Sequence, residues 1–153
     1  MQWQLSTDKG KTWSNVAGAT SGTYSFTSKA AQSGNLYRAA FTNAAGTTYS
    51  SNTALTVKIV TKTTESIADK HITKSQKAKI KVTVAPTSSK PTGTVTVHYG
   101  SKTKSVKLTA GDKGKVTVTL PKLKKGTYKV YATYGGSSKF ASDSSTKATL
   151  VVK

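Results

Sequence analysis

The chain has 153 residues, of which 35% are hydrophobic, and a formal net charge of +19 at pH 7. It contains no cysteine, which excludes disulfide bonds and thiolate metal sites. No apolar run approaches the roughly 20 residues of a membrane-spanning helix. Residues 1–4 have neither the charged nor the apolar part of a signal peptide. The low hydrophobic content predicts a small hydrophobic core. We also expect that the protein either is not exported or is a piece of a longer exported chain.

The charge divides the chain into two predicted units, residues 1–57 and residues 58–153. The first has a net charge of +3, whereas the second carries 20 basic residues against four acids, a net of +16. All basic residues except Arg38 are lysine. Specific reading of phosphate or guanine relies on the planar fork of arginine, so a lysine surface indicates diffuse, salt-sensitive attraction to polyanions. Strand lysines also block edge-to-edge aggregation, and that simpler role stays open.

Strands are predicted wherever apolar and polar residues alternate. A strand is expected at Ala54–Val57, and residues 65–78 lack a helical stripe and are expected to form an opening strand and a loop. Further strands with Gly- and Pro-containing turns between them are predicted at Lys79–Val84, Thr94–Val97, Val116–Leu120, Tyr128–Ala132 and Thr146–Val152. This spacing is typical of a β-sandwich. Period-two alternation leaves a wet face, which we expect to collect Lys79, Lys81 and Lys129.

The wet face is the candidate binding surface for an anionic cell-wall polymer or another polyanion. Its candidate residues are Lys77, Lys79, Lys81, Lys102, Lys104, Lys107, Lys122, Lys124, Lys125 and Lys129. The hypothesis rests on the charge of the second unit alone, because no motif in the sequence identifies a ligand.

No catalytic, cofactor or metal site is predicted. His71 and His98 are the only histidines, and neither has a neighbouring carboxylate cluster. Five scattered acids give no paired-carboxylate site and no calcium site. The aromatic side chains Trp13, Tyr24 and Tyr49 have the chemistry to stack on sugars, but packing across strands is the favoured interpretation.

The first unit resembles a bacterial Ig-like repeat. Its run QWQLSTDKGKTW at residues 2–13 is similar to the VQWQxSTDGGxTW run, and residues 32–39 are similar to the start of strand F. The resemblance implies that Trp3 lies on strand C and packs in the core, and that Tyr37 is the corner tyrosine, whose hydroxyl bonds to upstream backbone. Residues 43–46 would form the F–G turn and Ala54–Val57 strand G. Strands A and B would then be missing. We therefore expect either a fragment of a longer protein or a domain whose open apolar face is covered by a strand-completing partner or by homodimerisation.

The second unit resembles another bacterial Ig-like family. Its PTGTVTV run at residues 91–97 is similar to PTGTVTF, residues 120–128 to LPxLPAGTYTV, and YGGSSKFA at residues 134–141 to YSGDSNFA. In the last run Tyr134 and Phe140 would bracket a tight turn. The resemblance implies all-β modules that serve as stalks or weak adhesion domains of surface-exposed or secreted bacterial proteins. The predicted function is a non-catalytic stalk or adhesion module, exported as part of a longer chain whose other domains are its neighbours. The alternative is a structural or decoration protein of a phage virion.

Overall fold

The computed structural model describes residues 1–153, which form two compact units, Met1–Lys58 and Ile59–Lys153. Strands dominate both units, and the helices are three short 3-10 turns: η1 (Ala30–Gln32), η2 (Thr87–Ser89) and η3 (Ala110–Asp112). The predicted all-β class is confirmed. No helix combines the length and the apolar character needed to cross a membrane.

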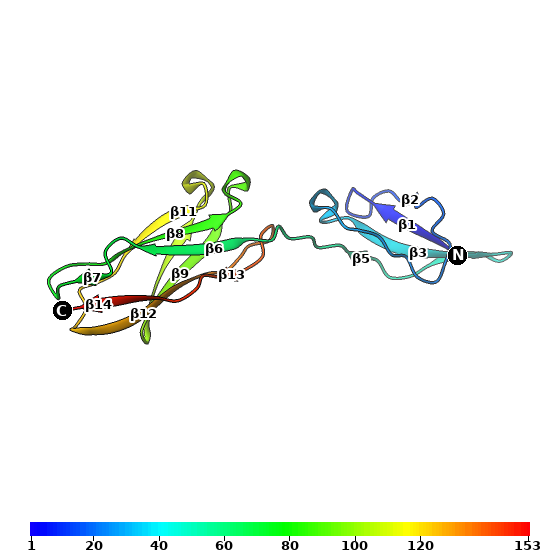
Figure 1. The fold of residues 1–153 in the computed structure, drawn as a ribbon. Helices are drawn as coiled ribbons and strands as arrows, with labels where there is room; N and C mark the ends of the chain where they lie inside the picture. The colour runs from blue at the N-terminus through cyan, green and yellow to red at the C-terminus, as the bar shows by residue number, and fades with distance from the viewer. The chain divides into compact units, whose positions relative to one another are not determined.

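The first unit is built on one antiparallel sheet (Figure 1). Its strands are β1 (Gln2–Ser6), β2 (Ser14–Asn15), β3 (Leu36–Asn43), β4 (Gly46–Tyr49) and β5 (Thr53–Ala54). They follow the order β2-β1-β3-β4, and β5 extends the β4 side of β3. The turn at residues 43–46 joins β3 to β4, as expected.

The strand predicted at Ala54–Val57 is largely wrong. The segment that follows the turn pairs from Gly46 onward, and pairing ends at Ala54. Beyond it, the N–H of Leu55 donates to the Asn35 carbonyl and the N–H of Val57 donates to the Ser33 hydroxyl. These donors are satisfied by a loop instead of a strand ladder, because β3 begins only at Leu36.

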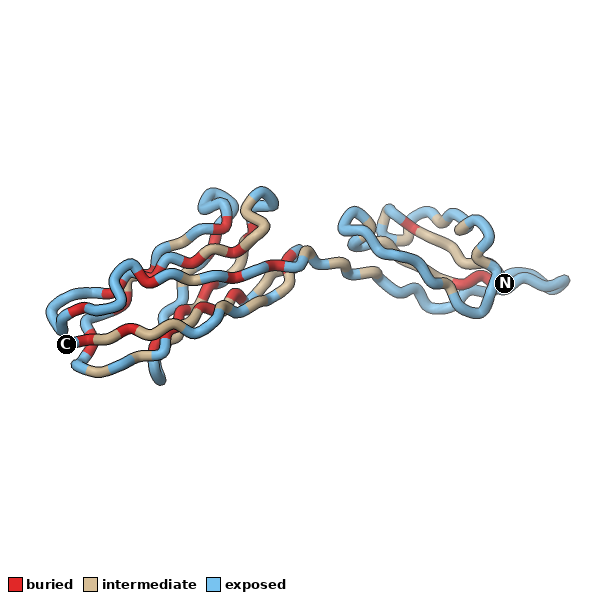
Figure 2. The backbone as a smooth tube through the Cα atoms, in the orientation of Figure 1, coloured by how far each residue is buried: buried red, intermediate tan, exposed pale blue.

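Few residues of the first unit are buried (Figure 2). Ser6, Ala39 and Ala40 are the fully buried ones, and no second sheet faces the first. The predicted core residue Trp3 is half-buried, and its indole N–H donates to the Ser21 carbonyl over 2.9 Å. The first unit is therefore a single sheet with partly covered faces.

The second unit is a sandwich of two sheets (Figure 1). The smaller sheet has the order β11-β8-β6 and contains β6 (Lys62–Ile67), β8 (Lys79–Ala85) and β11 (Lys115–Thr119). The larger has the order β10-β9-β12-β14-β7, with β13 on β12, and contains β7 (His71–Ile72), β9 (Gly93–Tyr99), β10 (Lys102–Leu108), β12 (Gly126–Tyr134), β13 (Asp143–Ser144) and β14 (Ala148–Val152). The predicted strands between residues 79 and 132 and the absence of a helix in residues 65–78 are confirmed.

A core of 19 buried residues lies between the two sheets. On β8 the apolar residues Ile80, Val82 and Val84 point inward, as the alternation predicts. Val95 and Val97 of β9 belong to the same core. Each fully buried aliphatic side chain contributes about 1.5–3 kcal/mol relative to exposure, so this core holds the two sheets face to face.

The two most specific sequence runs of the second unit meet in space. Tyr134 is 1% exposed, and its hydroxyl donates to the Thr92 carbonyl over 2.6 Å. Gly93 has a φ of +145°, and a Cβ there would lie 2.5 Å from the carbonyl oxygen of Gly136. Phe140 closes the same turn and is buried. The bracketing role predicted for Tyr134 and Phe140 therefore has a physical cause, which is the close approach of two backbone segments.

Candidate anion-binding site

The ten candidate lysines do not share one face. Lys79 and Lys81 lie on the outer side of the smaller sheet, because Ile80 and Val82 of the same strand point inward. Lys129 lies on the outer side of the larger sheet, next to the inward-pointing Val130, and donates to the Thr149 hydroxyl over 3.0 Å. The expectation that Lys79, Lys81 and Lys129 gather on one wet face is therefore wrong. A sandwich has two outer faces, and alternation does not say to which sheet a strand belongs.

The remaining candidates occupy the larger sheet, its edge and the adjoining loops. Lys107 lies outward on β10, opposite Thr94. Lys102 and Lys104 lie on the other side of β10, and the Lys104 ammonium donates to the Thr119 carbonyl over 2.6 Å. The others lie in loops: Lys77 precedes β8, and Lys122, Lys124 and Lys125 lie between β11 and β12.

The aspartate carboxylates of the chain accept hydrogen bonds from backbone N–H and hydroxyl groups, and none of these bonds comes from a lysine ammonium group. Each of the four aspartates accepts a hydrogen bond from a backbone N–H; the four pairs are Asp8 with Thr12, Asp69 with His71, Asp112 with Thr109, and Asp143 with Thr63. The lysine ammonium groups that form hydrogen bonds use neutral acceptors. The positive charge is therefore left for solvent or a ligand.

These hydrogen bonds lower the pKa of three of the aspartates. The side-chain and backbone bonds from Thr12, followed by the bond from Ser6, lower the pKa of Asp8 to about 2. The hydroxyl and the backbone N–H of Thr109 lower the pKa of Asp112, and the backbone N–H of Thr63 is the main cause that lowers the pKa of Asp143. Burial raises the pKa of Glu65. Hydrogen bonds to the charged carboxylate thus favour the ionised form of Asp8, Asp112 and Asp143.

Three of the candidate lysines line one hollow of about 380 Å³, which we call the lysine pocket. Its lining residues are Tyr99, Ser101, Lys102, Lys122, Leu123, Lys124 and Tyr128. They come from the β9–β10 turn and the strand ends beside it, from the loop before β12 and from the start of β12. No acid is among them, so the three lysines border a hollow that has no carboxylate in its lining.

Backbone hydrogen bonds hold both walls of the lysine pocket. Gly100 turns the chain with a φ of +63°, and its N–H donates to the Lys129 carbonyl over 3.2 Å. On the other wall the Tyr128 hydroxyl donates to the Lys124 carbonyl over 2.9 Å. Leu123 and Tyr99 are buried at 7% and 5% exposure and form the floor. The lysines therefore project from a fixed frame.

The corner tyrosine lies in the second unit. Tyr128 stands near the start of β12 and bonds to backbone four residues upstream, which is the geometry expected of a corner tyrosine. Tyr37, to which the resemblance assigned this role, forms no such bond, and its ring packs 5.3 Å from that of Phe26. That assignment is wrong. The signal for Tyr128 was its place two residues before the inward-pointing Val130.

The aromatic residues considered for sugar stacking are already engaged. The Arg38 guanidinium lies between the rings of Trp13 and Tyr49, at 4.0 and 3.8 Å from their centroids. Its Nε donates to the side-chain oxygen of Gln4 over 2.9 Å. Tyr24 stacks on Phe26 at 5.0 Å. Each of these side chains packs within the first unit, as the favoured interpretation held.

The other face of the first sheet carries an apolar hollow of about 440 Å³. Its lining residues are Trp3, Tyr24, Phe26, Tyr37, Ser50, Ser51, Thr53 and Leu55. Trp3 pairs with Ala39, and Leu5 pairs with Tyr37. Because side chains two residues apart on a strand point to the same side, Trp3 and Tyr37 lie on one side of the sheet. We call this side the aromatic face.

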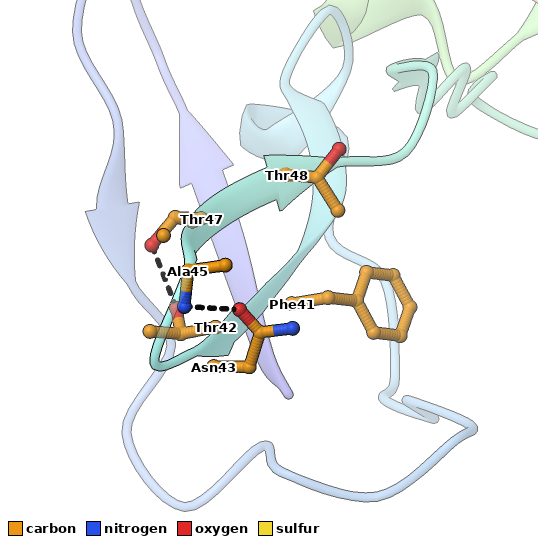
Figure 3. Close-up of a pocket in the computed structure, with 7 residues that line it drawn as sticks. Phe41, Thr42, Asn43, Ala45, Thr47 and Thr48 are labelled. Atoms are coloured by element: carbon orange, nitrogen blue, oxygen red, sulfur yellow. Dashed lines mark hydrogen bonds between the residues drawn. The ribbon is translucent and has the colours of Figure 1, made fainter.

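A polar hollow beside the β3–β4 turn is lined by residues that bond to their own hairpin. Figure 3 shows that the Asn43 side chain turns back onto its own loop, where its oxygen accepts from the Ala45 N–H over 2.9 Å. The hydroxyls of Thr42 and Thr47 bond to each other over 2.8 Å. The Phe41 ring, 47% exposed, projects from the opposite side of the hollow. The bonds of Asn43, Thr42 and Thr47 therefore stabilise the end of this hairpin.

The histidines do not assemble a reactive site. His98 stacks on Tyr131 with a centroid distance of 4.3 Å and lies 3.0 Å from the Thr133 hydroxyl. The backbone N–H of His71 is held by Asp69. No three His, Asp or Glu side chains come together where they could hold a metal ion. His98 is thus a packing residue on the outer side of the larger sheet.

A three-stranded sheet facing a larger sheet, with a tyrosine corner between them, defines an immunoglobulin-like sandwich. Residues 60–153 match the model of the bacterial Ig-like domain (group 3), and the chain belongs to this family. Residues 1–61 match a second model, described as a domain of unknown function (DUF8696). No curated protein and no solved structure matches the chain.

The match confirms the resemblance of the second unit to a bacterial Ig-like family, while the Ig-like nature of the first unit stays a prediction. Domains of this family are generally non-catalytic and are commonly found outside the cell or on its surface.

Proposed function

We propose that the chain is a non-catalytic stalk or adhesion module of a bacterial surface or secreted protein, retained on anionic cell-wall polymers by its lysines. The observation that carries this proposal is the placement of the charge. Exposed lysines cover the outer sides of both sheets and one end of the second unit, while the aspartates hold backbone groups.

A charge spread over several faces favours binding in many orientations. Each ammonium is a compact, hydrated point charge, so attraction to a polyanion is long-ranged and falls steeply with salt. Screening shortens the reach of such charges to about 10 Å at 0.1 M ionic strength. This behaviour suits weak retention on a polymer mesh, where no single docking geometry is needed.

The test is retention of the full chain on purified cell walls that carry phosphate-rich polymers, compared with the same walls after those polymers are removed. We expect retention on the first, loss on the second, and a steady decline as sodium chloride is raised. Retention that ignores both salt and polymer removal would contradict the proposal. The phage-virion alternative stays a prediction that genome neighbourhood would test.

We propose in addition that the aromatic face of the first unit docks a second copy of the chain. Phe26 and Phe41 are 39% and 47% exposed, and the sheet that carries Trp3 and Tyr37 has no opposing sheet. Two copies of one apolar face are complementary about a two-fold axis. Light scattering over a concentration series tests this, with Phe26→Ser as the variant expected to shift the chain to monomer. A monomer at all concentrations would exclude the dimer and leave a strand of another partner as the occupant.

A further inference from the structure

We infer that the lysine pocket binds a phosphate ester group of a polyol-phosphate or sugar-phosphate polymer. This inference rests on the proposed function, because it names the chemical group and the place through which the same anionic polymer is held. It adds one preferred site to a surface that otherwise attracts the polymer without a fixed geometry.

The hollow between its lysines makes the lysine pocket different from the outer sides of the sheets. On the outer sides of the sheets the lysines stand along the strands without a common hollow, for example Lys81 opposite Thr117 and Lys129 opposite Thr149. In the lysine pocket Lys102, Lys122 and Lys124 border one hollow that contains no carboxylate. Like charges on a common concave surface repel one another and focus a positive potential. An anion in the hollow relieves that repulsion.

The frame of the lysine pocket is set before any ligand arrives. The bond from the Tyr128 hydroxyl to the Lys124 carbonyl and the buried Leu123 fix the loop that carries Lys122 and Lys124. The bond from Gly100 to the Lys129 carbonyl fixes the turn that precedes Lys102. Binding then orders side chains and leaves the backbone unchanged, which lowers its entropic cost.

The donors and the size of the pocket select the ligand chemistry. Three lysines from two segments line the pocket, and Ser101 adds a hydroxyl to the lining. Such point donors suit the several oxygens of a tetrahedral phosphate better than the planar carboxylate that arginine grips bidentately. A volume of about 380 Å³ holds more than a bare phosphate, since one water occupies roughly 30 Å³ of liquid. The extra room beside Tyr128 fits the attached polyol or sugar unit.

Nucleic acid is the less suitable ligand for this pocket. Base stacking needs an open aromatic ring face, whereas Tyr99 is 5% exposed and Tyr128 packs against the core. A carboxylate polymer offers the charge but lacks the tetrahedral oxygens. Both ligands are outcomes that the experiment separates.

The experiment is an NMR titration of the full, isotope-labelled chain with glycerol 1-phosphate, glucuronate or a short oligothymidylate, at constant ionic strength. We expect saturable shifts of the backbone amides of residues 100–102 and 122–124 with glycerol 1-phosphate. Binding of glucuronate is expected to be weaker by about tenfold, or 1.4 kcal/mol. Equal or tighter binding of glucuronate or of the oligonucleotide at these amides would overturn the phosphate-ester assignment.

Two triple variants provide the matched comparison. Lys102→Gln, Lys122→Gln and Lys124→Gln together remove the pocket charges, and Lys79→Gln, Lys81→Gln and Lys115→Gln remove three exposed charges from the outer side of the smaller sheet. We expect the first set to weaken glycerol 1-phosphate binding by about tenfold or more and the second by less than about twofold. Both sets replace exposed side chains, and thermal melting checks that both variants fold.

A third variant separates positioning from charge. Tyr128→Phe keeps every lysine and removes the hydroxyl that holds the Lys124 carbonyl. Glycerol 1-phosphate binding should weaken about threefold or more while the salt dependence of polymer retention stays the same.

The pocket and the proposed function fail in different ways. Equal losses from the two triple variants, or ligand shifts spread evenly over both sheets, would overturn the pocket and leave diffuse retention standing. Retention of the wild-type chain that does not respond to salt would overturn the proposed function itself. Pocket shifts that persist in the first triple variant would show that its lysines are not the ligands.

Discussion

The two units of this chain differ in how the apolar side of a sheet is covered. The second places two sheets face to face and buries 19 residues between them. The first has one sheet, and its only buried residues are Ser6, Ala39 and Ala40. Both contain well-paired antiparallel strands, so strand pairing alone does not make a core. What differs is whether a second layer covers the apolar side.

In the first unit, side chains instead of a second sheet partly cover both sides of the sheet. On one side the Arg38 guanidinium is held between Trp13 and Tyr49. On the other side the aromatic face is covered in part by Tyr24 and Phe26, from a segment without strand pairing. These contacts are partly open to water, so each contributes less than a buried aliphatic side chain.

The same truncation in each unit is the strongest way to test this contrast. Leu150 is fully buried, and Leu150→Ala should destabilise the second unit by about 2–5 kcal/mol. Leu55 lines the open aromatic hollow, and Leu55→Ala should cost the first unit less than about 1.5 kcal/mol. Both tryptophans lie in the first unit, so tryptophan fluorescence follows its unfolding in urea and amide NMR follows the second. Equal costs would mean that the aromatic face is covered in solution.

The next effect concerns the buried tyrosine of the second unit. Tyr134→Phe removes the hydroxyl that donates to the Thr92 carbonyl and leaves that carbonyl without its partner, at a cost of about 1–3 kcal/mol. Tyr131→Phe is the matched control, because the Tyr131 ring lies on the outer side of the sheet, stacked on His98. Denaturant midpoints that move equally for both variants would contradict the role given to the Tyr134 bond.

A smaller effect is expected from the arginine layer of the first unit. Arg38→Lys keeps the charge but removes the planar group between Trp13 and Tyr49 and the bond to Gln4, so the first unit should lose about 1–2 kcal/mol. Lys29→Met, which removes an exposed charge outside this layer, should change its stability by less than about 0.5 kcal/mol. An unchanged fluorescence transition in Arg38→Lys would show that the stack is not stabilising.

The smallest effect is a difference in acid sensitivity. The pKa of Asp8 is lowered to about 2, so its bonds stabilise the first unit above the ordinary pKa of an aspartate, and this contribution is lost as pH falls toward about 2. In the second unit, the lowered pKa of Asp143 acts in the same direction, but the raised pKa of Glu65 favours the folded state on protonation. Fluorescence-detected unfolding between pH 5 and pH 2, chosen to span these values, should show a decline that Asp8→Asn abolishes.

Much of the second unit could be predicted from its sequence. Alternation located the strand of Ile80, Val82 and Val84 and the strand of Val95 and Val97, because a half-buried strand must repeat every two residues. The bracketing pair Tyr134 and Phe140 was also predicted. The charge of the second unit was evident from composition, whereas the attraction to polyanions that it predicts remains a proposal.

The arrangement of the lysines, in contrast, was decided by the tertiary structure. Alternation with period two predicts whether a side chain points toward the core or toward solvent, but not which sheet its strand joins. Lys81 and Lys129 lie on opposite outer sides because their strands belong to different sheets. Lys102 and Lys124 meet at one pocket because a hairpin turn and a loop from distant parts of the chain pack side by side. The place of Arg38 between two aromatic rings likewise depends on β2, β3 and β4 sharing one sheet. Local pattern therefore determined the strands and the total charge, and long-range packing determined which lysines lie near one another.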